Sequence, residues 1–243
     1  MQIRRFDTAT EAGLYAATIV EQVMLNRRRP VLGLATGASM LPVYDSLIGF
    51  HREGLDFASA VSINLDEYVG LPRECEQSLH AYMDRHLMRY VNVSKNNMYI
   101  PNGDAKDLDS ECARYDEVLR ANPRDVQLLG IGVNGHIAFN EPDDSLSTRT
   151  HVVSLANETI TSNSRFFDDA SRVPRRGITM GLQSIMQSKK IVLLAFGQEK
   201  SHAVRLALSG KVTTDIPASM LQLHPDATVV LDANSAELLS SRQ

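Results

Sequence analysis

The sequence feature that most restricts the fold is an alternation of short apolar, β-branched runs with longer amphipathic stretches. The short runs predict buried strands, and the stretches between them have the spacing of apolar residues that predicts helices. Strands that alternate with helices are typical of a mainly parallel sheet covered by helices on both faces. The sequence therefore predicts an open α/β fold.

The predicted elements extend over most of the chain. The predicted strands are Val31 to Ala35, Val61 to Leu65, Val126 to Ile131, Lys190 to Phe196 and Thr228 to Leu231. The predicted helices are Ala9 to Arg27, Leu41 to Arg52, Leu79 to Tyr90, Ser110 to Ala121, Lys200 to Leu208 and Ser235 to Ser240. No fixed-period repeat and no low-complexity linker divides the 243 residues, so we expect one Rossmann-like domain over residues 1–243.

Charge and hydropathy restrict the partners and the location. A formal net charge of −4 provides no broad cationic field, which argues against nucleic acid and anionic membranes and favours a small-molecule ligand. The sequence has no apolar run of the roughly 18 to 20 residues that a membrane span needs, and no apolar segment follows the N-terminal charges. We therefore expect a cytoplasmic protein. Cys75 and Cys112 show no disulfide or zinc spacing and are expected to be free thiols.

Polar residues follow four of the predicted strands. Thr36 to Ser39 follow the first strand, Asp66 and Glu67 the second, Gly132 to Glu141 the third, and Gly197 to Lys200 the fourth. Open α/β sheets bind ligands beyond the carboxyl ends of their strands. We therefore expect these four clusters to meet at one edge of the sheet and to form a ligand site.

The loop ATGAS, Ala35 to Ser39, joins a strand to a helix, where backbone N–H groups and the helix N-terminus favour an anion. A phosphate site and an ordinary turn with a side-chain N-cap are both compatible with this loop. It has neither a Walker loop nor GxGxxG spacing, which argues against a nucleotide. Arg165 and Lys200 would complete a phosphate clamp, although each cation alone is also compatible with a solvated surface position.

The segment LLGIGVNGHIAFNEP, Leu128 to Pro142, carries the strongest signal for catalysis. Histidine titrates near neutral pH, and Glu141 can orient His136, while the glycines allow a sharp turn or a close approach to a ligand. Asp66 or Glu67 could be a general base or a helix cap, since adjacent strand residues point in different directions. No group of His, Cys and carboxylate residues has metal spacing, so acid–base catalysis without metal or cofactor is expected.

The string GHIAFNEP in this segment resembles the glucosamine-6-phosphate deaminase family, and the resemblance extends through LDEYVGLP, NSRFFD, FGQEK and LQLHP. The related 6-phosphogluconolactonases share the fold and the GHxA core but continue differently where this sequence has FNEP. The same fold also serves as a sugar-phosphate sensor in transcription regulators. We do not expect a sensor, because no helix-turn-helix stretch precedes the first predicted strand.

This resemblance implies a metal-independent deaminating aldose–ketose isomerase that converts glucosamine 6-phosphate and water to fructose 6-phosphate and ammonia. It implies that Asp66 moves a proton between C2 and C1. It also implies that His136, oriented by Glu141, opens the sugar ring by protonating O5. The residues that would hold the 6-phosphate are Thr36, Gly37, Ala38, Ser39, Arg165 and Lys200.

Two departures from the family pattern concern catalysis and regulation. Many relatives have Asp at the position of Asn134, which can form hydrogen bonds but carries no charge. Residues 143–153 contain Arg149 as their one permanent cation, whereas allosteric relatives use several basic residues there for an activator phosphate. We therefore expect Asn134 to complete the catalytic group with His136 and Glu141. We also expect simple hyperbolic kinetics in a monomer or small homo-oligomer.

Overall fold

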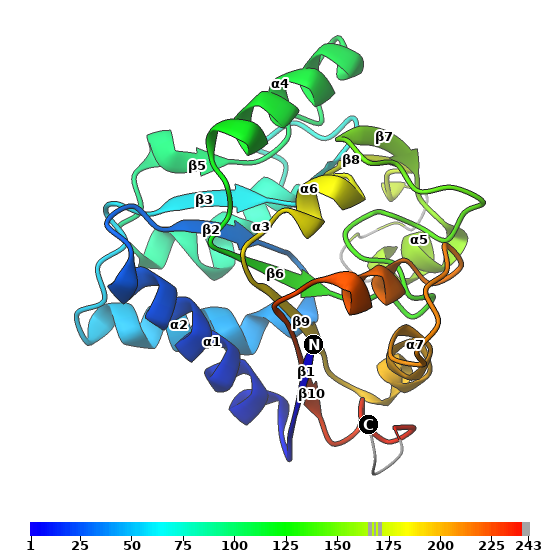
Figure 1. The fold of residues 1–243 in the computed structure, drawn as a ribbon. Helices are drawn as coiled ribbons and strands as arrows, with labels where there is room; N and C mark the ends of the chain where they lie inside the picture. The colour runs from blue at the N-terminus through cyan, green and yellow to red at the C-terminus, as the bar shows by residue number, and fades with distance from the viewer. Residues whose placement is uncertain (165–166, 168, 170–171, 240–243) are drawn as a thin grey trace.

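The structure, a computed structural model, describes residues 1–164, 167, 169 and 172–239, and a seven-stranded sheet forms its centre (Figure 1). The strand order is β1-β10-β9-β6-β2-β3-β5, and all neighbouring strands run parallel. The strands are β1 (Gln2–Phe6), β2 (Val31–Leu34), β3 (Val61–Asn64), β5 (Met98–Tyr99), β6 (Val126–Gly130), β9 (Ile191–Ala195) and β10 (Ala227–Asp232).

Helices cover both faces of this sheet. The helices are α1 (Ala9–Asn26), α2 (Leu41–Arg52), α3 (Leu79–His86), α4 (Leu108–Ala121), α5 (Asn157–Asn163), α6 (Leu182–Met186) and α7 (Ser201–Ala207). In Figure 1, α1 and α2 lie on one side of the sheet and α4 and α6 on the other. β9 is therefore buried along its whole length, as strands of a parallel sheet covered on both faces are. The predicted α/β fold with an open, mainly parallel sheet is confirmed.

A second, three-stranded sheet is antiparallel and was not predicted. It has the order β4 (Asp66–Tyr68), β8 (Arg176–Thr179) and β7 (His151–Ser154). A single residue, Leu65, separates the end of β3 from the start of β4. The apolar residues Tyr68, Leu79, Phe139 and Leu155 form a small separate core beside it. The residues that directly follow β3 therefore belong to this second sheet and not to the main sheet.

The five predicted strands are confirmed with each end within one residue of its predicted position. The helix predicted over Leu41 to Arg52 is also found with those bounds. α3 is shorter than the predicted Leu79 to Tyr90, because Leu87 leaves the helical conformation (φ −146°, ψ −57°) and Met88–Tyr90 form a 3-10 turn.

The helix predicted over Ser235 to Ser240 is wrong. Residues 235–238 form turns, Leu239 lies in a bend, and Ser240 lies outside the described residues. The hydroxyl of Ser235 donates to the carbonyl of Ala195 (2.6 Å), and its backbone N–H donates to the side chain of Asp232 (2.9 Å). These side-chain bonds compete with helical backbone bonds in a segment too short to form a stable helix.

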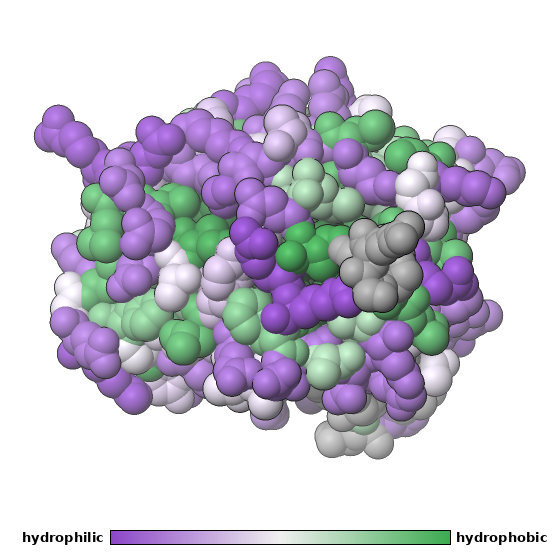
Figure 2. Space-filling view, turned by 60° about the horizontal axis from the view of Figure 1, so that its bottom comes forward, coloured by the Kyte–Doolittle hydropathy of each residue, from purple (hydrophilic) through white to green (hydrophobic). Residues whose placement is uncertain are grey.

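The surface combines hydrophilic and apolar side chains. On the face shown in Figure 2, apolar side chains lie between hydrophilic ones. Among the described residues, none of the helices combines the length and the apolar character needed to cross a membrane.

Candidate active site

A cavity of about 620 Å³ lies beyond the carboxyl ends of β2, β6 and β9 and beside β4. All four polar clusters that follow the predicted strands contribute to its wall. Of the residues predicted to form the site, those on the wall are Thr36, Gly37, Ala38, Ser39, Asp66, His136 and Lys200. The cavity is therefore built at the position where open α/β sheets bind their ligands.

Two strand-to-helix loops of the same design border the cavity. After β2, Gly37 has φ +107° and leads into a 3-10 turn and α2. After β9, Gly197 has φ +92° and leads into a 3-10 turn that ends at Lys200, followed by α7. A positive φ favours glycine, since a Cβ atom makes this region unfavourable. Both loops bring backbone N–H groups close to a helix start, an arrangement that suits an anion.

The two loops differ in what already contacts them. The Asp232 carboxylate accepts hydrogen bonds from the backbone N–H of Gly197, with N–O distances of 3.1 and 3.2 Å. That carboxylate supplies a negative charge from within the protein at the β9 loop. At the β2 loop, the Tyr82 hydroxyl instead donates to the carbonyl of Gly37 (2.9 Å), which holds the loop from its carbonyl side.

His136 lies on the cavity wall with its imidazole ring packed against Gly132. A Cβ atom on Gly132 would lie 2.3 Å from the ring, so only glycine leaves room for this histidine. Nδ1 of His136 lies 3.1 Å from Oε2 of Glu141. When Nδ1–H donates to that carboxylate, Nε2 is the nitrogen left for a ligand.

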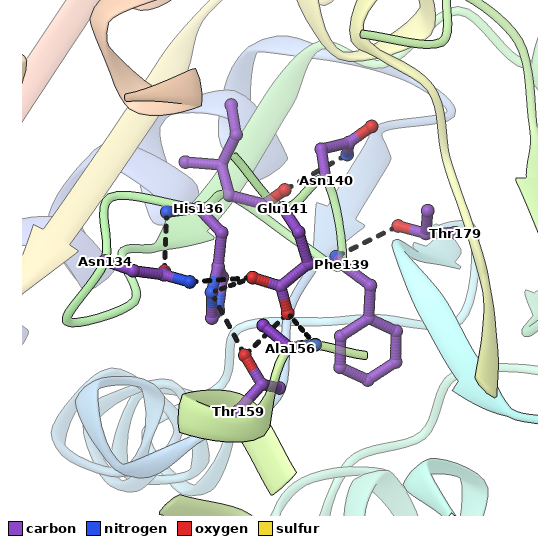
Figure 3. Close-up of polar contacts among 9 residues, drawn as sticks. Asn134, His136, Phe139, Asn140, Glu141, Ala156, Thr159 and Thr179 are labelled. Atoms are coloured by element: carbon purple, nitrogen blue, oxygen red, sulfur yellow. Dashed lines mark hydrogen bonds and ion pairs between the residues drawn. The ribbon is translucent and has the colours of Figure 1, made fainter. Parts of the chain in front are cut away.

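The Glu141 carboxylate lies behind His136 and is held through both oxygens (Figure 3). The Asn134 amide donates to Oε2 (2.9 Å), while the Thr159 hydroxyl (2.6 Å) and the backbone N–H of Ala156 (3.3 Å) donate to Oε1. Burial raises the pKa of Glu141, but hydrogen bonds and the charge of His136 outweigh it and lower the pKa to about 2. Glu141 is therefore an anion at neutral pH.

Asp66 and Glu67 are adjacent carboxylates that point in different directions. Asp66 lies on the cavity wall, whereas Glu67 accepts hydrogen bonds from the backbone N–H groups of Tyr68 (2.8 Å), Leu79 (2.9 Å) and His80 (2.9 Å). Glu67 therefore caps the start of α3. Burial, and secondly the charge of Glu67, raise the pKa of Asp66 to about 8.

Residues 4–230 match the family of glucosamine-6-phosphate isomerases and 6-phosphogluconolactonases. The chain belongs to this family. It is 50% identical over 232 residues to the glucosamine-6-phosphate deaminase of Lactobacillus johnsonii, an alignment that covers 96% of this chain and 95% of that protein.

Two solved structures that share the fold differ in how similar their sequences are to this chain. A monomeric glucosamine-6-phosphate deaminase is 41% identical and superposes with a TM-score of 0.96, over 98% of this chain and 100% of that chain. The 6-phosphogluconolactonase of Leishmania guyanensis is 20% identical, with a TM-score of 0.79 over 99% of both chains, and shares the fold. The resemblance to the deaminases inferred from GHIAFNEP is therefore confirmed.

The predicted site residues take three kinds of position. Asn134 and Glu141 lie behind His136, and Arg165 lies outside the described residues. The other predicted site residues lie on the cavity wall: Thr36, Gly37, Ala38, Ser39, Asp66, His136 and Lys200. Among the described residues, no group of three or more His, Cys, Asp or Glu side chains is arranged to hold a metal ion.

The sequence did not indicate three further residues of the site. Thr159 and Arg85 lie on the cavity wall, and Tyr82 both lines the cavity and holds the β2 loop. Tyr82 and Arg85 lie one turn apart on α3, which was predicted as a helix without any sign that it faces a ligand. Thr159 lies on α5, which has seven residues and was not predicted at all.

Proposed function

We propose that the protein is a deaminating aldose–ketose isomerase that converts glucosamine 6-phosphate and water to fructose 6-phosphate and ammonia. The observation that carries this proposal is that Asp66 and His136, with Glu141 behind His136, lie at one cavity bordered by two strand-to-helix loops that each contain a glycine with positive φ. One carboxyl there has a pKa raised to about 8, and the other a pKa lowered to about 2. Carboxyls separated in this way can divide the work of acid–base catalysis.

In this proposal the 6-phosphate binds at the loop after β2. Backbone N–H groups of Thr36 to Ser39 and the start of the following helix would receive the phosphate oxygens. Lys200, from the loop after β9, would add a point charge, and Arg165 a planar guanidinium. The position of Lys200 on the same cavity wall supports this arrangement.

Ring opening is proposed for His136. A protonated His136 would donate its Nε2 proton to the ring oxygen O5 while the C1–O5 bond breaks and the C1 hydroxyl gives its proton to water. The product of this step is the open-chain aldehyde. The Glu141 anion at Nδ1 would stabilise the charged imidazole before the transfer and fix its orientation.

Isomerisation is proposed for Asp66. Its carboxylate would take the proton from C2 of the open-chain amino aldehyde and return it to C1, while O1 gains the proton that the C2 amine loses, which leaves a C1 hydroxyl and a C2 imine. Water then adds to C2, ammonia leaves, and fructose 6-phosphate is formed. Proton transfer next to a carbonyl requires a base held in the right orientation in a site that excludes bulk water. The burial of Asp66 at the cavity wall meets that requirement.

We also propose that the chain acts as one domain over residues 1–243, in the cytoplasm, as a monomer or small homo-oligomer with hyperbolic kinetics. The solved deaminase that is 41% identical is monomeric, which supports the first of these oligomeric states. The scarcity of permanent cations in residues 143–153 supports the absence of a phosphate effector site there.

A coupled assay tests the reaction. Purified protein is mixed with glucosamine 6-phosphate, and ammonia and fructose 6-phosphate are measured in parallel; we expect the two products in equal amounts. 6-Phosphogluconolactone serves as the control substrate and should be hydrolysed no faster than without enzyme. Lactone hydrolysis without ammonia release from the amino sugar would overturn the proposal.

A further inference from the structure

Thr159 of α5 contacts both members of the His136–Glu141 pair. Its hydroxyl donates to Oε1 of Glu141 at 2.6 Å, and its oxygen lies 3.4 Å from Nδ1 of His136. The side chain is buried and belongs to the cavity wall (Figure 3). Thr159 therefore lies where α5 meets the catalytic pair.

The two oxygens of Glu141 depend on different parts of the chain. Oε2 is held by Asn134 and His136, which come from the same loop as Glu141 itself. Oε1 is held from α5, by the Thr159 hydroxyl at 2.6 Å and by the backbone N–H of Ala156 at 3.3 Å. The hydroxyl is the shorter of these two contacts, so its loss would leave Oε1 with one long hydrogen bond.

The orientation of this carboxylate decides which nitrogen of His136 faces the cavity. A carboxylate fixed in the plane that receives Nδ1–H keeps the proton on Nδ1 and leaves Nε2 to the ligand. A carboxylate that rotates away allows the proton to move to Nε2 of the neutral ring. Wrong tautomers lower catalysis without removing the residues that bind the substrate.

We propose that Thr159 is a positioning residue that fixes the Glu141 carboxylate against Nδ1 of His136, so that Nε2 is presented to the sugar ring. This inference rests on the proposed deaminase function and adds a residue of α5 to its machinery. Ala156, the N-cap residue of α5, has no side-chain cap, and its own backbone N–H donates to the Glu141 carboxylate. The same anion thus joins α5 to the catalytic histidine.

Three substitutions separate the hydroxyl from the rest of the side chain. Thr159→Val keeps the shape and removes the donor, and we expect kcat to fall about 10- to 100-fold with KM for glucosamine 6-phosphate within about two-fold. Thr159→Ser keeps the hydroxyl and should retain kcat within about three-fold. Thr161→Val, on the exposed side of the same helix, is the matched control and should leave both constants unchanged. Thr159→Ala replaces the valine variant if that variant does not fold.

A spectroscopic measurement reads the tautomer directly. In protein labelled with ¹⁵N-histidine, assigned with His136→Gln and measured in alkaline solution where the ring is neutral, we expect His136 to carry its one proton on Nδ1 in the unsubstituted protein and in Thr159→Ser. Thr159→Val should give a mixture of tautomers. A merely structural role for Thr159 would lower the melting temperature without changing this signal.

The outcomes distinguish this inference from the proposed function. If the unsubstituted protein releases no ammonia, the proposed function fails, and the tautomer of Thr159→Val still decides the role of Thr159. An unchanged tautomer in Thr159→Val overturns the inference, whatever happens to kcat. Equal losses of kcat in Thr159→Val and Thr159→Ser also overturn it, because the hydroxyl would then not be the group that matters.

Discussion

Asp66 and Glu141 are both buried carboxyls of the same site, yet their pKa values are displaced in opposite directions. Glu141 receives hydrogen bonds from His136, Asn134, Thr159 and Ala156, and these outweigh the cost of burying its charge. No described residue donates a hydrogen bond to the Asp66 carboxyl, and the neighbouring Glu67 carboxylate opposes its ionisation. Burial therefore raises the pKa of both groups, and the donors and charges around each group decide the net direction of its shift.

The difference suits the two carboxyls to different work. A carboxylate held by four donors stays charged and fixed, which suits a partner that orients a histidine. A carboxyl without donors, with a pKa near neutral pH, can take up and release a proton during a reaction. The predictions below ask whether the two groups are as different in solution as their surroundings indicate.

Asp66→Asn should have the largest effect on activity. We expect kcat to fall about 10²- to 10⁴-fold, the range that general acid–base catalysis contributes, because an amide cannot accept the C2 proton. Sugar-phosphate binding should be retained, because Asp66 is not part of the phosphate loops. Steady-state deamination rates and the binding constant of a competitive sugar phosphate measure the two effects separately.

Glu67→Gln is the control for this substitution. The Glu67 side chain points to α3 and not to the cavity. The substitution should therefore lower the free energy of unfolding, and it should lower kcat far less than Asp66→Asn does. Reversed effects of Asp66→Asn and Glu67→Gln would mean that Glu67 is the carboxyl that reaches the substrate.

Glu141→Gln should lower kcat about 10²-fold, the low end of the range for acid–base groups. The amide keeps the size of the carboxylate, but it has no charge to stabilise the imidazolium and one acceptor oxygen fewer for its four donors. KM for glucosamine 6-phosphate should change little. Full activity in this variant would reduce Glu141 to a structural support for the loop and for α5.

The pH dependence of kcat/KM tests the raised pKa of Asp66. Only the ionised carboxylate is a base, so kcat/KM should have a limb that rises with pH up to a pKa of about 8, and because ring opening also requires a protonated His136 the whole profile should be bell-shaped. Glu67→Gln removes the neighbouring charge that raises this pKa and should move the rise to lower pH. An unmoved profile in that variant would show that Glu67 does not affect the titrating group.

The main sheet could be predicted from the sequence because its central strands are continuous apolar runs. β9 and β10, buried on both faces, contain enough apolar residues to be recognised without any partner. β1 was missed because Arg4 and Arg5 interrupt its pattern, and it is paired on one side by β10. The three strands of the second sheet have three or four residues each, too few for a periodic pattern to appear.

The parts of the candidate site that could be predicted are those with an unusual local sequence. The glycines around His136 and the carboxylate at Glu141 could be found because ordinary loops seldom combine them. Thr159 could not be found, since threonine is common and its role arises only when α5 packs against a loop 18 positions earlier in the chain. The local sequence pattern alone could not decide which of Asp66 and Glu67 faces the cavity, because the direction of β4 and the position of the start of α3 decide it.

Asp66→Asn should also make the protein more stable at alkaline pH. The folded-state pKa of about 8 lies above the unfolded value of about 4, so the neutral carboxyl favours folding below pH 4, and this contribution is lost as pH rises through 8. The free energy of unfolding of the variant should therefore exceed that of the unsubstituted protein by an amount that grows between pH 4 and 8. We expect on the order of a few kcal/mol from urea unfolding curves. A stability difference that stays constant between pH 4 and 8 would mean that the pKa of Asp66 is not raised in the folded protein.

Glu141→Gln should show the opposite pH dependence with a smaller effect. The folded-state pKa of about 2 lies below the unfolded value of about 4, so the ionised carboxylate stabilises the fold above pH 4, and this contribution is lost as pH falls towards 2. The variant should be less stable at pH 6 by on the order of 2 kcal/mol and should approach the unsubstituted protein in acid. Asn134→Ala, which removes one donor and keeps the carboxylate, should reproduce part of this loss. If Glu141→Gln lost the same stability at pH 3 and pH 6, shape and packing would be responsible, and the donors would not be what distinguishes Glu141 from Asp66.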